Sequence, residues 1–87
     1  MAMRVAVVSP EREVWSGEAD MVIARTPDGE IGVLAGHTPL LGVLTEGQTV
    51  RIKTGTREIA AEVDGGFVSV SKDGVSVLAE KADLIGT

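Results

Sequence analysis

The stretch TVRIKTGTREIAAEV, residues 49–63, decides the fold class of this chain. In its first half Val50 and Ile52 share one parity, and two cationic side chains share the other. Successive side chains of a β-strand point to opposite faces, so this alternation predicts a strand with one buried face and one face in water. The intervening Thr-Gly-Thr at 54–56 fits a tight hairpin with glycine in the left-handed conformation. The second half repeats the alternation, and its inward positions are Ile59, Ala61 and Val63.

The same period of two recurs along the chain between turn-forming residues. Residues 67–71 and 75–79 flank an Asp-Gly pair, which is a strong hairpin signal. Residues 21–24 read as a strand that ends in a Pro-Asp-Gly turn at 27–29. No stretch sustains the 3.6-residue period of a helix. We therefore predict an all-β fold, an antiparallel β-sandwich or flattened barrel of roughly eight to ten short strands.

Length and composition fit a single small domain that spans residues 1–87. The chain has one Phe, one Trp and no Tyr, so the core must be built mostly from Val, Ile, Leu and Ala. It has no Cys, so no disulfide supports the fold. Residues 80–87 follow the last strand signal, and we expect them to form a tail.

Charge and hydropathy exclude several classes of partner. The net charge of −5 argues against a general nucleic-acid binder, which needs cations to replace counterions, and against adsorption to anionic lipid. The apolar run at Val5–Val8 is far shorter than the ~20 residues of a membrane-spanning helix. We expect neither nucleic-acid binding nor direct membrane insertion.

The residues that carry chemistry in enzymes are sparse in this chain. The Gly-Glu-Ile-Gly segment at 29–32 lacks the Lys-Ser/Thr pair of a phosphate loop. One His and no Cys argue against a zinc site, and no Gly-x-Ser-x-Gly elbow is present. His37 stands beside a Gly and before Thr-Pro, a context typical of a turn residue that bonds local backbone. We predict no catalytic residue, metal ligand or cofactor, and a small hydrolase built on His37 remains a rival hypothesis.

The segment from Gly36 to Leu44 has an unusual composition. Pro39 lacks the N–H that a central strand requires, so the sheet pattern is interrupted there. Residues 40–44 are then apolar on both parities. One interpretation is a strand buried on both faces, or a lid over the end of the sandwich. The other interpretation is an exposed apolar patch that binds a partner.

These residues, taken with others along the chain, resemble a known family, the epsilon subunits of bacterial F-type ATP synthases, in their N-terminal β-sandwich domain. The resemblance runs in order across nearly the whole chain, and its most specific part is the pair formed by 29–32 and 36–41. The matching segments are VVSPE (7–11), WSGEA (15–19), GEIGV (29–33), GHTPLL (36–41), VRI (50–52), GGFV (65–68) and VSVLAE (75–80).

The resemblance implies a non-catalytic part of the rotor, in the central stalk. Such a subunit binds the gamma subunit, sits on the ring of membrane c subunits, and couples proton translocation to ATP synthesis in the alpha/beta hexamer. It would lie peripherally at the cytoplasmic face of the bacterial plasma membrane. The turn with Glu30 and Ile31 would face the polar loops of the c ring, and the segment around His37 would face gamma. The implied partner contacts are Ser9, Glu30, Ile31, His37, Thr38, Pro39, Leu40, Leu41 and Gly42.

Some features depart from the family pattern. The family usually continues into a C-terminal helical hairpin, which carries its inhibitory and ATP-sensing behaviour, whereas this chain stops at Thr87. Ala35 stands where a proline is often found, and Thr38 stands where alanine is usual. The alternative to a rotor subunit is a free-standing small β-sandwich that binds a ligand or a protein.

Overall fold

The computed structural model describes residues 3–27, 29–36 and 39–85, and these residues form ten strands and no helix. The strands are β1 (Met3–Val8), β2 (Glu13–Ala19), β3 (Met21–Thr26), β4 (Gly29–Leu34), β5 (Leu40–Val43), β6 (Gln48–Thr54), β7 (Arg57–Asp64), β8 (Phe67–Ser71), β9 (Gly74–Leu78) and β10 (Lys81–Leu84). The all-β prediction and its approximate number of strands are confirmed.

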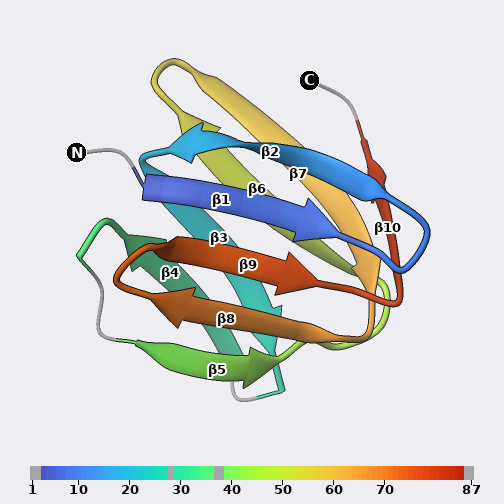
Figure 1. Ribbon diagram of the computed structural model, residues 1–87. Coiled ribbons are helices and arrows are strands. Elements are labelled where there is room, and N and C mark those ends of the chain that lie inside the picture. The colour runs from blue at the N-terminus through green and yellow to red at the C-terminus, as the bar shows by residue number, and fades with distance from the viewer. Residues whose placement is uncertain (1–2, 28, 37–38, 86–87) are drawn as a thin grey trace.

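The strands form two five-stranded sheets that stack face to face, as Figure 1 shows. Sheet A has the order β2-β1-β9-β8-β5, and sheet B has the order β10-β7-β6-β3-β4. Each sheet keeps two edge strands, so the molecule is a sandwich. The alternative of a flattened, closed barrel is wrong, because closure would need the outer strands of the sheets to pair with one another.

One pair of neighbouring strands differs from the predicted antiparallel pattern. β1 and β9 run parallel, with Val5 opposite Val75 and Val7 opposite Val77. Parallel neighbours cannot be joined by a tight hairpin, so no local turn signal reveals them. Here the first strand of the chain lies between β2, its hairpin partner, and a strand from the far end of the sequence.

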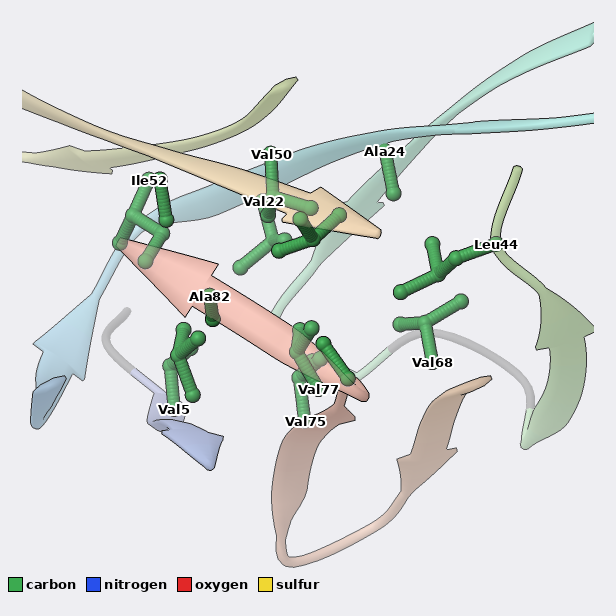
Figure 2. Packing of buried hydrophobic residues seen from close by; sticks show 14 of the residues in the cluster. Val5, Val22, Ala24, Leu44, Val50, Ile52, Val68, Val75, Val77 and Ala82 are labelled. Atoms are coloured by element: carbon green, nitrogen blue, oxygen red, sulfur yellow. The ribbon is translucent and has the colours of Figure 1, made fainter. Parts of the chain in front are cut away.

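The core lies between the sheets and follows the predicted alternation. Figure 2 shows Val22, Val50 and Ile52 of sheet B opposite Val5 and other valines of sheet A. The predicted inward residues of β7 are also buried, namely Ile59, Ala61 and Val63. No polar side chain belongs to this buried set among the described residues. Hydrophobic burial between the two sheets is therefore what holds the sandwich together.

The expectation that residues 80–87 form a tail is wrong for residues 81–84, which form β10. β10 pairs antiparallel with β7 and adds an edge strand to sheet B. Ala82 is buried opposite Val63, and Asp83 forms an ion pair with Arg12 at 3.3 Å. A four-residue strand with one small inward side chain has too weak an alternation to be recognised, so pairing with β7 decides its structure.

The predicted hairpin turns between β6 and β7 and between β8 and β9 are confirmed. Gly55 joins β6 to β7 with a φ of 60°, the left-handed conformation expected for that hairpin. Gly74 ends the turn between β8 and β9 with a φ of 144°. Asp28, in the predicted turn after β3, lies outside the described residues.

Candidate protein-binding surfaces

The outer face of sheet A carries a row of apolar side chains that runs across four strands. Val8 lies opposite Leu78, Leu78 opposite Phe67, and Phe67 opposite Val43. These four residues, which we call the apolar row, point away from the core because their neighbours in each strand point into it. Phe67, Leu78 and Val43 are each about half exposed. Paired residues on one face are side by side, so the row forms a continuous apolar surface.

One end of the apolar row opens into a shallow groove of about 410 Å³. The groove lies between the end of β1, with Ser9 and Pro10, and the side chains of Phe67 and Leu78. Ser9 is fixed in a tight turn, since its N–H donates to the Arg12 carbonyl at 2.9 Å and its own carbonyl accepts the Arg12 N–H at 3.2 Å. The predicted contact residue Ser9 therefore borders the apolar row.

The other end of the row is β5, which resolves the two interpretations of residues 40–44. Leu40 packs against the core and Leu44 is only 3% exposed, so these two residues face inward. Leu41 is 70% exposed and, with Val43, faces outward. The interpretation of a strand buried on both faces is therefore wrong, because one parity packs in the core and the other forms an exposed apolar surface. That this surface binds a partner stays a prediction.

Gly42 faces inward on β5 at a place where there is little room. A Cβ at this position would lie 3.2 Å from Val68 Cγ1 and 3.4 Å from Thr26 Cγ2. Glycine therefore lets the edge of sheet A approach the end of β3 in sheet B. This predicted contact residue serves the packing of the two sheets.

A second groove, of about 380 Å³, lies on the open side of the sandwich between β4 and β5. Ile31 lines it from β4, and Leu40 and Leu41 line it from β5. Pro27 completes the wall at the end of β3. The fold thus brings together two groups of predicted contact residues that are separate in the sequence.

Glu30 lies in β4, an edge strand of sheet B, and its position there differs from the prediction. The sequence predicts a glycine-flanked turn here, whereas residues 29–34 form β4 and Glu30 lies directly opposite Arg25 in β3. Its Oε2 atom lies 3.5 Å from a guanidinium nitrogen of Arg25 and 3.8 Å from one of Arg51. The carboxylate is therefore not a free anion at the tip of a loop.

The remaining predicted contacts divide into described and undescribed residues. Pro39 is exposed and immediately precedes β5. His37 and Thr38 lie outside the described residues, so the predicted roles of these two stay predictions.

Sequence reasoning missed Val8, Phe67 and Leu78. These residues occur in strands whose alternation the sequence predicts correctly, but alternation alone implies an outer face that is wet along its whole length. The available signal is apolar residues at the outward parity, Phe67 at the start of β8 and Leu78 at the end of β9. Only the register between strands shows that they are neighbours.

Metal-binding clusters and membrane-spanning helices are both absent from the described part of the chain. No group of three or more His, Cys, Asp or Glu side chains there could hold a metal ion. No helix long and apolar enough to cross a membrane occurs in the same residues.

Comparison with known proteins connects this geometry to a family. The family model described as "ATP synthase, Delta/Epsilon chain, beta-sandwich domain" matches residues 2–85. The ATP synthase epsilon chain of Frankia casuarinae is 69% identical over 84 residues, which cover 97% of this chain and 99% of that protein. The epsilon chain of Streptomyces coelicolor is 53% identical over 83 residues, which cover 94% of this chain and 66% of that protein.

Solved structures share the fold at low sequence identity. A chain in the Euglena gracilis mitochondrial ATP synthase, in a structure of its OSCP, F1 and c-ring, superposes with a TM-score of 0.87 at 22% identity, covering 95% of this chain and 53% of that one. A chain in the central stalk and c-ring of the Tetrahymena thermophila mitochondrial ATP synthase gives 0.77 at 16% identity, covering 94% and 66%. These likenesses establish the sandwich.

Proposed function

This chain belongs to the ATP synthase delta/epsilon family as its β-sandwich domain, and we propose from this membership that it is a non-catalytic rotor subunit of an F-type ATP synthase. In this role it links the gamma subunit to the ring of c subunits in the central stalk, and so couples proton translocation to ATP synthesis. It would sit peripherally at the cytoplasmic face of the bacterial plasma membrane.

The observation that carries the proposal is the apolar row on sheet A. A folded monomer rarely leaves a large contiguous apolar surface in water, and such surfaces mark sites of protein association. Ser9 borders the row at one end, and Leu41 extends its exposed apolar surface along β5 at the other. Two contacts that the family resemblance assigns to gamma thus flank one surface, so we assign the apolar row to gamma.

A different part of the molecule would meet the c ring. Glu30 lies on the outer face of sheet B, whereas the apolar row lies on the outer face of sheet A. Two partners can therefore be held at once by separate faces of one rigid sandwich. A packed β-core between the two contacts would transmit torque with little internal deformation, because protein interiors are close-packed.

The proposal is tested by placing a charge in the apolar row. Phe67→Glu should weaken binding to purified gamma at least tenfold, because the interface would bury an unpaired carboxylate. Phe67 is half exposed in the free chain, so the substitution should leave the fold intact. Binding would be measured by calorimetry, and folding by circular dichroism.

Ser71→Glu is the matched control. Ser71 lies on the same strand and outward parity as Phe67, opposite Gly74 and away from the apolar row. The Ser71→Glu substitution adds the same charge as Phe67→Glu. It should leave the affinity for gamma within about twofold of the wild-type value. Wild-type affinity in a folded Phe67→Glu variant would show that this face does not bind gamma.

A further inference from the structure

Sheet A has an open edge along β5. This strand is the last in the order of the sheet and pairs antiparallel with β8 on one side only, as Figure 1 shows. Within the described part of the chain, no strand pairs with its other side. An edge strand of this kind presents backbone N–H and C=O groups that have no partner in the sheet, so another chain can pair with it.

The hydrogen bonding of β5 shows which of its backbone groups face the open edge. The Leu44 N–H donates to the Gly66 carbonyl at 2.9 Å, and the register of β5 with β8 makes these two residues directly opposed. Hydrogen-bonded and non-hydrogen-bonded pairs alternate along antiparallel strands. Gly42 therefore directs its N–H and C=O toward β8, whereas Leu41 and Val43 direct theirs to the open edge.

The same two residues also carry exposed apolar side chains. Leu41 and Val43 are 70% and 56% exposed on the outer face of the sheet. Free backbone groups and apolar side chains on one edge are the features that main-chain strand addition uses, the first for affinity and the second for specificity. Pro39 immediately precedes β5 and has no N–H to donate, so the available edge is confined to this short stretch.

The groove of about 380 Å³ between β4 and β5 runs beside this edge. A strand added to β5 would have alternate side chains on opposite faces. Those opposite Leu41 and Val43 would lie on the outer face of sheet A, and a residue between them would point into the groove, where Ile31 and Leu40 form apolar walls. The edge therefore fits an extended segment that is apolar at successive positions.

The position of β5 favours gamma over a second copy of this chain. Val43 belongs to the apolar row, so a strand added to β5 would continue the surface that the proposed function assigns to gamma. Two copies of this chain would each bring a net charge of −5, and the four residues of β5 include no charged side chain that offsets this repulsion.

From this geometry we infer that an extended apolar segment of gamma adds to β5 as a sixth strand of sheet A, through the backbone groups of Leu41 and Val43. The inference rests on the proposed function and specifies how the partner is held. Main-chain hydrogen bonds contribute to the affinity in addition to the side-chain contacts of the apolar row.

The test compares two substitutions at one position. Leu41→Pro and Leu41→Ala both change the exposed side chain, but only the proline removes the N–H at the open edge. Leu41→Pro should bind purified gamma about tenfold more weakly than Leu41→Ala, because a carbonyl of gamma loses its donor. The lost N–H makes no bond within the sheet, so circular dichroism should show that both variants are folded. Equal affinities of the two folded variants would overturn the inference.

Hydrogen exchange of the wild-type chain gives a second readout that needs no substitution. In the free chain, the Leu41 and Val43 amides should exchange faster than the Gly42 amide, which is bonded to β8. Bound gamma should slow the exchange of Leu41 and Val43 by about tenfold or more, because their N–H groups become hydrogen-bonded. Unchanged exchange of these two amides in the complex would contradict strand addition.

The remaining outcomes separate this inference from the proposed function. If Phe67→Glu weakens gamma binding while Leu41→Pro and Leu41→Ala bind equally, the proposed function stands and the inference fails. If the wild-type chain does not bind gamma, the proposed function is refuted and the inference falls with it. A dimer of the free chain that Leu41→Pro dissociates, measured by sedimentation, would assign the edge to a second copy and overturn the inference.

Discussion

Single glycines determine whether strands can approach one another in this protein. Gly66 has a φ of 105° in the turn between β7 and β8, and its carbonyl accepts the Leu44 N–H at 2.9 Å. A Cβ there would overlap the Leu78 carbonyl oxygen and lie 2.7 Å from the Ala79 Cα. Neither obstacle is a flexible side-chain end, so the backbone itself would have to move.

Gly66→Ala is therefore expected to lower the free energy of unfolding by more than about 3 kcal/mol, from a disfavoured φ combined with a backbone clash. Gly55→Ala is the control, because Gly55 also has a positive φ, 60°, but a methyl group added there would meet no atom within 4 Å. It should cost only about 1 kcal/mol. Urea denaturation measures both, and equal costs would show that the close approach at Gly66 is absent.

Leu44 and Leu41 allow the stability effects of a buried and an exposed leucine to be compared. Leu44→Ala should cost about 2–5 kcal/mol, because it leaves a cavity in the core. Leu41→Ala removes an exposed side chain and should change stability by less than about 0.5 kcal/mol. Thermal unfolding of both variants tests the assignment, and a large loss for Leu41→Ala would place that side chain in the core.

At the scale of the element, the edge strands depend on their neighbours more than on their own sequences. β5 and β10 have four residues each, too few for alternation alone to fix their register. β10 buries only Ala82, yet it covers the edge of β7 and links to the β1–β2 turn through the Arg12–Asp83 ion pair. Covering an edge also protects it against pairing with other chains.

Substitutions in β10 should separate its buried face from its exposed face. Ala82→Glu places a charge in the core and is expected to destabilise the fold by about 2–4 kcal/mol or to detach β10. Asp83→Ala removes an exposed ion pair, and its effect should stay below about 1 kcal/mol. Urea denaturation would measure the stability of both variants, and hydrogen exchange of the β7 amides would report detachment of β10. An unchanged stability for Ala82→Glu would show that β10 does not pack as described.

At the scale of the whole molecule, the parallel pair β1–β9 joins the two ends of the chain. Neither sheet can be completed by one contiguous segment, since sheet A takes strands from the beginning, middle and end of the sequence. A partly folded chain would leave strand edges and valine side chains in water. Cooperative unfolding is the physical consequence.

Trp15 provides a natural probe for this cooperativity. It is the only Trp in the chain, it lies in β2 of sheet A, and it packs against the core. We expect its fluorescence and the far-ultraviolet circular dichroism to report one coincident transition in urea. Val7→Ala, in β1, should shift both probes together to lower urea. Separate midpoints would mean that the sheets unfold independently.

The sequence by itself determined the all-β class, the strands and hairpins at residues 49–63 and 67–79, and the alternation that marks their inward positions. Alternation fixes which side chains share a face because successive residues of a strand point in opposite directions, and glycine marks turns because it accepts a positive φ. Residues 49–63 illustrate this, since their strands, their hairpin and their buried positions all agree with the structure. These are local properties of the chain.

Only the tertiary structure decided which strands are neighbours beyond these hairpins, and in what register. The apolar row draws on four strands, and Arg51 reaches Glu30 across β3, so neither surface exists until the sheets are assembled. The parallel pairing of β1 with β9 and the addition of β10 to β7 likewise join segments without a local signal. The physical reason is that pairing depends on how both sheets bury their apolar faces together, which is a property of the whole sandwich.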